Sequence, residues 1–500
     1  MSPSTSSFLF ALFLVTLSIR GGEPFKFLVV SPRFAKSHVN FLGKISDVLI
    51  DAGHEVVMLS PVVDDSLGSP GTSRARIIEI PQCQEARMNM DLHRERNLWE
   101  TPAGIGMFTS MRPFVNAIMA QCNATIHHPG LIENLKTENF DVAYAEGNNF
   151  CTFGLFHLLG IEKYAVTHSF SFISGMHYMT NAPSNPSYVP ALLSGHFGEE
   201  MTFFQRVQNS LSYFFMDWIL LPLAFHSYQN FFTCIDDSFP HFEDILSKTS
   251  MVFFNGDSLT DFPRPTSHKI IEIGGITVPE GQNPLNKTWS DILNTRPRNV
   301  LISFGTFAMS HVLPEVYKAT IVCVVKKFPN VTFIWKYEKP EHEISLGIGN
   351  LVEAVRVPQA ALLRDNRLSA FVTHCGQGSV VEANNAGVPL VAIPIAADQI
   401  RNAQQVKRNG IGVVLRREDL ESNDKLKEAI HEVLYSEKYA KRARRLAEMV
   451  AKRPYNPKQI FARNMEFLSE FGPLRLLDHS GAKLNFFQFF LLDIVAFAVL

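Results

Sequence analysis

Several polar residues of this chain stand where an apolar strand gives way to a helix. His374 ends the apolar run at residues 369–374, and Gly376, Gly378 and Ser379 follow it. Backbone N–H groups at a helix start, together with the helix dipole, bind anions, and glycine lets the backbone approach a ligand closely. This spacing predicts a diphosphate site in which His374 donates a hydrogen bond to a phosphate oxygen.

Groups that accept hydrogen bonds from hydroxyls flank this turn. Glu382 lies one helical turn beyond Gly378, and Asp398 and Gln399 follow the next strand. Because the carboxyl ends of parallel strands meet at one edge of a sheet, we expect these side chains to face one cleft. Glu382 suits ribose hydroxyls, and Asp398 and Gln399 suit those of a sugar. No third glycine completes a dinucleotide fingerprint, which argues against a nucleotide-dependent oxidoreductase.

A second candidate centre lies near the N-terminus. His38 closes the segment 31–38, which follows an apolar strand, and we expect it in a loop facing the cleft just before a helix. Imidazole, with an ordinary pKa of about 6.5, suits general-base work near neutral pH. A single histidine is more often a surface or capping residue, so the residue types alone leave both interpretations open.

The elements that must position these residues alternate between strands and helices. In the first half the pattern predicts strands at residues 25–30, 54–59, 140–145 and 164–167 and a helix over 40–52. In the second half it predicts strand-like segments at residues 299–306, 331–336, 369–374 and 389–394 and helices over 312–327 and from 378. Such alternation indicates an α/β fold of two doubly wound halves, each with a parallel sheet covered on both faces.

The composition shifts over residues 274–294 to Gly, Pro, Asn and Lys, as in a linker. We therefore divide the chain into an N-terminal domain at residues 23–280 and a C-terminal domain at residues 281–480 that carries the predicted diphosphate site. A signal peptide at residues 1–22 precedes them, and an apolar segment at residues 484–500 follows.

The two ends predict a membrane-associated protein of the secretory pathway. Residues 8–19 form an apolar run followed by small residues, which is typical of a signal peptide. Residues 484–500 are typical of the entry into a transmembrane helix, but a full span needs about 20 apolar residues, and an interfacial or packed helix is the alternative. An endoplasmic reticulum route also agrees with three N-glycosylation sequons, at Asn123, Asn286 and Asn330.

Composition limits the remaining classes. The 500 residues carry 46 Lys and Arg against 48 Asp and Glu, so the basic excess that nucleic-acid binding needs is missing. The 41 Phe residues suit a lipophilic ligand or a membrane as well as a core. Residues 203–232 in particular predict an acceptor pocket, a membrane contact or packed helices, and these three stay open. The six cysteines show no C-x-x-C spacing, which excludes a zinc ribbon and leaves one or two unassigned disulfides.

Together these motifs resemble the UDP-glycosyltransferase family, in particular the animal glucuronosyltransferase-like membrane enzymes of the endoplasmic reticulum. The family signature is matched, with the same intervals, at Pro358, Gln359, Thr373, His374, Gly376, Ser379, Glu382, Asp398 and Gln399. The resemblance covers essentially the whole chain. It implies a GT-B-like fold of two Rossmann-like domains facing a cleft, with an acceptor-binding domain at 23–280 and a UDP-sugar-binding domain at 281–480.

The resemblance also implies roles for single residues. The donor-binding set comprises Gly305 and Thr306 at a second phosphate loop, Gln359 in the signature, His374 and Ser379 at the diphosphate, Glu382 at the ribose, and Asp398 and Gln399 at the sugar. Where the family has a Trp stacked on uracil, this chain has Arg356, whose guanidinium plane can also stack on a base. The family's base and its carboxylate partner match His38 and Glu146.

The reaction that the resemblance implies is a direct displacement with inversion. His38 takes the proton of an acceptor hydroxyl, whose oxygen attacks the anomeric carbon of a glucosyl or glucuronosyl group, while Glu146 orients the imidazole. The departing UDP is stabilised by His374 and the amides of the helix start. We expect a small lipophilic acceptor and neither a metal nor a cofactor, since the UDP-sugar is a co-substrate. A non-catalytic relative that binds a UDP-sugar or a lipophile is the alternative, and homo-oligomer formation is left open.

Overall fold

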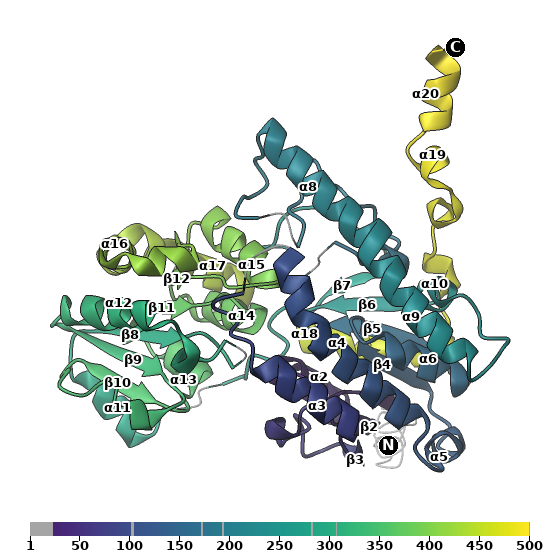
Figure 1. The fold of residues 1–500 in the computed structure, drawn as a ribbon, viewed down its shortest axis with the longest axis horizontal. Coiled ribbons are helices and arrows are strands. Elements are labelled where there is room, and N and C mark those ends of the chain that lie inside the picture. Colours follow the sequence, from purple (N-terminus) through teal and green to yellow (C-terminus); the bar gives the residue numbers. More distant parts are fainter. Residues whose placement is uncertain are drawn as a thin grey trace, which may run out of the picture.

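The structure, a computed structural model, describes residues 24–101, 105–171, 174–192, 195–281, 284–306 and 308–499. The predicted signal peptide at residues 1–22 lies outside this range. Figure 1 shows two α/β units side by side, each a sheet with helices on its faces. The C-terminal helices α19 (Phe486–Phe489) and α20 (Leu492–Val499) extend away from both units.

Within the described residues the N-terminal unit contains a seven-stranded sheet in the order β3-β2-β1-β4-β5-β6-β7, with all neighbours parallel. Its strands are β1 (Lys26–Val30), β2 (Glu55–Pro61), β3 (Arg76–Ile80), β4 (Val142–Glu146), β5 (Tyr164–His168), β6 (Met251–Phe254) and β7 (Ile270–Glu272). The central strands are almost wholly buried, as expected for a sheet covered on both faces. The strand order reverses between β1 and β4, the point where doubly wound sheets bind ligands.

The C-terminal unit repeats this order. Over the residues that the structure describes, its six parallel strands run β10-β9-β8-β11-β12-β13. They are β8 (Arg298–Ser303), β9 (Val331–Lys336), β10 (Leu351–Ala354), β11 (Leu368–Thr373), β12 (Leu390–Ala392) and β13 (Gly412–Val414). Here the order reverses between β8 and β11. Both predicted sites therefore follow strands at the reversal points of their sheets.

Helices connect the strands on both faces. In the N-terminal unit they are α2 (Lys36–Asp51), α3 (Gln84–Arg94), α4 (Ile105–Ile126), α5 (Leu131–Thr137), α6 (Phe150–Leu158), α7 (His177–Thr180), α8 (Phe203–Phe215), α9 (Leu221–Thr233) and α10 (Phe242–Ser247). In the C-terminal unit they are α11 (Lys287–Asn294), α12 (Glu315–Lys326), α13 (Gln359–Arg364), α14 (Gln377–Ala386), α15 (Asp398–Arg408), α16 (Asn423–Tyr435) and α17 (Glu437–Ala451). The predicted linker at 274–294 thus ends in α11.

The apolar segment at residues 203–232 forms α8 and α9, joined without a break by a π-helical turn at Met216–Leu220. Helix α9 packs into the core through Phe225, Tyr228 and Phe232. Helix α8 instead leaves apolar side chains in solvent, and Phe204 is 80% exposed. Core packing therefore explains α9 but leaves the apolar face of α8 unexplained.

Two segments cross from one unit to the other. Helix α18 (Pro457–Phe471) returns from the C-terminal half and places Phe461, Met465 and Leu468 in the core of the N-terminal unit (Figure 1). Trp99, between α3 and α4, goes the opposite way and is buried in the C-terminal core. Each unit thus completes the core of the other, which holds them in a fixed relation.

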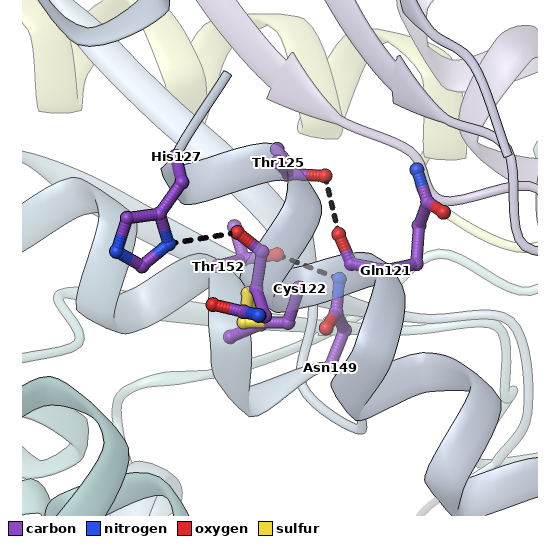
Figure 2. Close-up of a disulfide and its surroundings, with 8 residues drawn as sticks. Gln121, Cys122, Thr125, His127, Asn149 and Thr152 are labelled. Atoms are coloured by element: carbon purple, nitrogen blue, oxygen red, sulfur yellow. Dashed lines mark hydrogen bonds between the residues drawn. A yellow bond between two sulfur atoms is a disulfide. The ribbon is translucent and has the colours of Figure 1, made fainter. Parts of the chain in front are cut away.

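A disulfide between Cys122 and Cys151 joins α4 to α6. Figure 2 shows it beside Asn149, which donates from Nδ2 to Thr152 Oγ1 at 2.7 Å at the start of α6. Both sulfur atoms lie in the core of the N-terminal unit. This assigns one of the disulfides that the sequence left open.

The predicted C-terminal membrane entry at residues 484–500 forms the short helices α19 and α20, whose apolar side chains are largely exposed. Among the residues that the structure describes, no helix is both long enough and apolar enough to cross a bilayer.

Candidate active site

His38 and Glu146 meet at the reversal point of the N-terminal sheet. Glu146 is the last residue of β4 and is 2% exposed, while His38 follows β1. Glu146 Oε2 lies 2.5 Å from His38 Nδ1. A carboxylate in this position fixes the tautomer of the ring, since Nδ1 carries the proton and Nε2 is free to accept another.

The sequence placed His38 in a loop before the helix, and the structure corrects this. Helix α2 begins at Lys36, four residues earlier than predicted, so His38 is its third residue. The apolar spacing of Phe41, Ile45 and Leu49 had marked only the part of the helix that packs on the sheet. Helical backbone holds the imidazole more firmly than a loop would.

The charges around this pair favour the ionised states. Burial alone would lower the pKa of His38, but the charge and hydrogen bond of Glu146, with the charge of Asp398, raise it above its ordinary value. Burial alone would raise the pKa of Glu146, but the charge of His38 and hydrogen bonds from His38 and Ser169 lower it. Asp398 belongs to the other unit, so the two units are within electrostatic reach at His38.

Ser169 is a third member of this centre that the sequence analysis missed. It directly follows β5, the neighbour of β4, and its backbone N–H donates to Glu146 Oε1 at 2.8 Å. Its hydroxyl lies 3.1 Å from His38 Nδ1. Only the adjacency of β4 and β5 could have suggested it, because serine after a strand carries no signal of its own.

In the C-terminal unit the predicted diphosphate turn joins β11 to α14. His374 follows β11, Gly376 caps α14, and the helix begins at Gln377, one residue before the predicted start. Gly305, after β8, lies against the same ring: a Cβ on Gly305 would come within 2.7 Å of His374 Nε2. Its φ of +81° also favours glycine. The two loops that were predicted to face phosphate are therefore brought together around His374.

The His374 ring is neutral at physiological pH. Burial, with a smaller contribution from the charge of Lys336, lowers its pKa to about 4. A neutral imidazole still has one N–H to donate. Lys336, at the end of β9, also donates to the Gly305 carbonyl oxygen and lies 3.1 Å from Glu338 Oε1. Lys336 is thus a cation next to His374 that the sequence motifs did not indicate.

Gln359, Ser379 and Glu382 form one cluster. Gln359, the first residue of α13, donates from Nε2 to Ser379 Oγ at 3.1 Å and to Glu382 Oε2 at 2.8 Å. Burial raises the pKa of Glu382. The structure thus brings together three residues that the sequence had assigned to one donor site, with the carboxylate of Glu382 as a hydrogen-bond acceptor.

Asp398 and Gln399 begin α15 after β12. Burial raises the pKa of Asp398, while a hydrogen bond from Asn402 Nδ2 at 2.8 Å opposes this. The same Nδ2 donates to the Cys375 carbonyl oxygen at 3.0 Å and so ties Asp398 to the turn after His374. Gln399 Oε1 accepts from the backbone N–H of Ile395 at 2.9 Å, so its amide nitrogen is the group to consider for a ligand.

Within the part of the chain that the structure describes, the remaining predicted donor residues make no side-chain contact that defines a role. Arg356 and Thr306 are exposed, and a Cβ added at Gly378 would meet no atom within 4 Å. The three sequon asparagines, Asn123, Asn286 and Asn330, are all exposed. Among the described residues no three His, Cys, Asp or Glu side chains are grouped as around a metal ion.

These features define a class by fold. The chain is similar to the solved structure of the glycotransferase of kitacinnamycin, with a TM-score of 0.56, 16% identity and coverage of 89% of this chain and 99% of that chain. At this identity the likeness concerns the fold alone. It confirms the predicted α/β architecture, the GT-B arrangement of two Rossmann-like units found in glycosyltransferases.

The sequence comparisons then give the family. The family described as "UDP-glucoronosyl and UDP-glucosyl transferase" matches residues 26–500, and the chain belongs to it. A Caenorhabditis briggsae protein named provisionally as a UDP-glucuronosyltransferase, ugt-47, is 28% identical, with 99% of this chain and 93% of the relative covered. UDP-glucuronosyltransferase 1A8 of Rattus norvegicus is 27% identical over 92% of this chain and 86% of its own. The protein is therefore a UDP-glycosyltransferase, acting on a UDP-sugar donor and an acceptor.

Proposed function

We propose that this enzyme moves a glucosyl or glucuronosyl group from a UDP-sugar to a hydroxyl of a small lipophilic acceptor, with inversion at the anomeric carbon. The observation that carries the proposal is the contact of 2.5 Å between His38 Nδ1 and Glu146 Oε2 at the reversal point of the N-terminal sheet, where Glu146 is buried and His38 is partly accessible. The names of the relatives, including the rat UDP-glucuronosyltransferase, support the glucuronosyl group.

In this proposal His38 is the general base. Its Nε2 takes the proton of the acceptor hydroxyl while that oxygen bonds to the anomeric carbon and the bond to the UDP oxygen breaks. The imidazolium that forms is stabilised by the adjacent Glu146 carboxylate, which Ser169 holds in place. Attack on the face opposite the leaving group inverts the carbon in a single displacement.

The C-terminal unit supplies the leaving-group site. Negative charge develops on the diphosphate as the bond breaks, and the N-terminus of α14 with the His374 N–H can stabilise it. Lys336 adds a positive charge beside His374. Glu382 and Gln359 are assigned to the ribose, Asp398 and Gln399 to the sugar hydroxyls, and Ser379 to the diphosphate.

The test is the variant His38→Ala. We expect it to abolish formation of the glycoside, measured by mass spectrometry with each UDP-sugar and a mixed panel of phenols and alcohols, while calorimetry shows unchanged UDP affinity. His128→Ala is the matched control, because His128 is exposed on the loop after α4. Unchanged turnover in His38→Ala would refute the base assignment. UDP binding without product in the wild-type protein would instead favour a non-catalytic binding relative.

The proposal includes a membrane-associated place in the endoplasmic reticulum lumen. The disulfide between Cys122 and Cys151 supports an oxidising compartment. The exposed apolar side chains of α8 and of the π-helical turn after it, among them Phe204 and Trp218, and those of α20 support contact with lipid. Flotation with phosphatidylcholine vesicles tests this: loss of binding in Phe204→Ser with Trp218→Ser supports it, and no flotation of the wild-type protein refutes it.

A further inference from the structure

A hydrogen-bonded path links the diphosphate helix of one unit to the base pair of the other. It starts at Gln377, the first residue of α14, whose side chain is 7% exposed. Gln377 Nε2 donates to the backbone carbonyl oxygen of Asn255 at 2.6 Å, across the boundary between the units. Gln377 therefore connects the donor side to the acceptor side.

The path continues through the N-terminal unit. Asn255 follows β6, is 2% exposed, and donates from Nδ2 to the Ser169 carbonyl oxygen at 3.0 Å. Ser169 in turn holds Glu146 through its N–H and lies against His38 through its hydroxyl. Beyond Gln377, the path thus runs through Asn255, Ser169 and Glu146, which lie at the carboxyl ends of β6, β5 and β4, next to His38.

Other contacts join the units without reaching the base pair. Arg401 of α15 pairs with Asp261 at 2.7 Å, and both side chains are almost fully buried. Trp99 donates from its indole N–H to the Met309 carbonyl oxygen at 3.2 Å. These contacts hold the units together as bodies, whereas the path through Gln377 ends on the groups that act on substrate.

We propose that Gln377 and Asn255 are positioning residues that set the distance and orientation of the base pair relative to the donor diphosphate. The inference rests on the proposed function, since it assigns the pair as the base. Buried hydrogen bonds do not compete with water and hold geometry firmly. Displacement transfer needs the attacking oxygen in line with the leaving group, and small misplacements remote from the chemistry reduce turnover.

The first test separates turnover from binding. Gln377→Met keeps the length of the side chain and removes its donor, and we expect kcat to fall about tenfold while the UDP Kd stays within about twofold. Asn255→Asp places a carboxylate against the Ser169 carbonyl oxygen and should show the same split. Asn385→Leu is the matched control, because Asn385 lies on the same helix, α14, and among the described residues its Nδ2 donates to the Val381 carbonyl oxygen of that helix and not across the boundary between the units.

The double variant Gln377→Met with Asn255→Asp sharpens the test. If both residues are links in one path, the double variant loses no more than the larger single loss, because either break already uncouples the units. Additive losses in kcat, or a loss in Asn385→Leu equal to that in Gln377→Met, would overturn the proposal. Circular dichroism of each variant verifies that it is folded.

Hydrogen exchange tests the coupling without transfer activity. UDP is expected to slow exchange in peptides covering residues 164–171 of the wild-type protein but not of Gln377→Met. If the wild-type protein forms no product but shows this protection, the proposed function fails and the coupling stands. If it forms product but UDP protects residues 164–171 equally in both proteins, or in neither, the coupling is refuted. Failure of UDP to bind the wild-type protein refutes both.

Discussion

Glu146, the carboxylate partner of the proposed base, offers the sharpest perturbation. Glu146→Gln keeps the shape of a side chain that is 2% exposed and removes its charge. The contact with His38 Nδ1 at 2.5 Å then becomes a neutral hydrogen bond, and the amide can turn so that its oxygen or its NH₂ faces the ring. The variant therefore removes the charge that stabilises the imidazolium. It also no longer fixes which ring nitrogen of His38 carries the proton.

The size of the effect follows from these two losses. Removing the orienting carboxylate of a histidine base lowers turnover by about 10²–10⁴, which at about 1.4 kcal/mol per tenfold is roughly 3–5 kcal/mol of barrier. Glu146→Asp retains the charge but withdraws it by one methylene, so we expect a smaller loss. In both variants the UDP affinity should stay unchanged, because the diphosphate site lies on the other unit.

The pH dependence of kcat/KM gives a second, independent test of the role of Glu146. The base acts when His38 is deprotonated, so kcat/KM of the wild-type enzyme rises as pH passes the His38 pKa, which lies above its ordinary value. In Glu146→Gln burial still lowers the pKa of His38, but the charge of Glu146 that opposed this effect is gone. Of the charges that raise the His38 pKa, that of Asp398 remains. The inflection should therefore move to lower pH while the plateau falls.

The assay is glycoside formation between about pH 5 and 9, a range that brackets the ordinary histidine pKa of about 6.5. Saturating UDP-sugar is used for the plateau and limiting acceptor for kcat/KM. A Glu146→Gln enzyme with wild-type turnover and an unmoved inflection would refute the role of this pair. An inflection that moves to higher pH would refute the electrostatic argument, even if turnover falls.

Two further predictions follow from other parts of the structure. Gly305→Ala should weaken UDP binding about tenfold, because left-handed φ strains a non-glycine residue by ~1–3 kcal/mol and the new Cβ meets His374. Calorimetry measures the UDP affinity, and Gly349→Ala is the control, because a Cβ at Gly349 meets no neighbouring atom. Replacing Cys122 and Cys151 by Ala opens a loop of 29 residues and should reduce the free energy of unfolding in urea by about 3–4 kcal/mol. An unchanged urea midpoint would contradict this second expectation.

Much of the fold could be predicted because buried strands carry strong local signals. The strand predicted at 331–336 coincides with β9, and those at 25–30 and 164–167 differ from β1 and β5 by one residue at an end. The edge strands β3, β7, β10 and β13 and the buried strand β6 were not predicted. Four of them, β6, β7, β10 and β13, have only three or four residues each, and β3 is partly exposed. The start of α2 was placed too late because its first turn is polar.

The grouping of the candidate site residues could be predicted where a motif is local but not where it depends on tertiary packing. His374, Ser379 and Glu382 lie within nine residues of one another, so their spacing alone indicates a shared turn and helix. Ser169 and Asn255 act only because β4, β5 and β6 are neighbours. Nothing in the largely polar segment around Trp99 shows that its indole completes the core of the other unit, because this contact arises only from tertiary packing.

The backbone is strained at two turns of the C-terminal unit, the one after β11 and the one after β12. Cys375 and Ala397 have φ of +65° and +54°, each adjacent to a motif residue, His374 or Asp398. Such conformations cost about 1–3 kcal/mol for a non-glycine residue and persist only where the surroundings enforce them. Asn402 supplies that enforcement for both turns, because its Nδ2 holds the Cys375 carbonyl oxygen and the Asp398 carboxylate. One side chain thus fixes both strained turns, so His374, at the proposed diphosphate site, and Asp398, within electrostatic reach of His38, are held at a fixed distance from each other. The proposed transfer requires this, because the glycosyl group would lie between the two units.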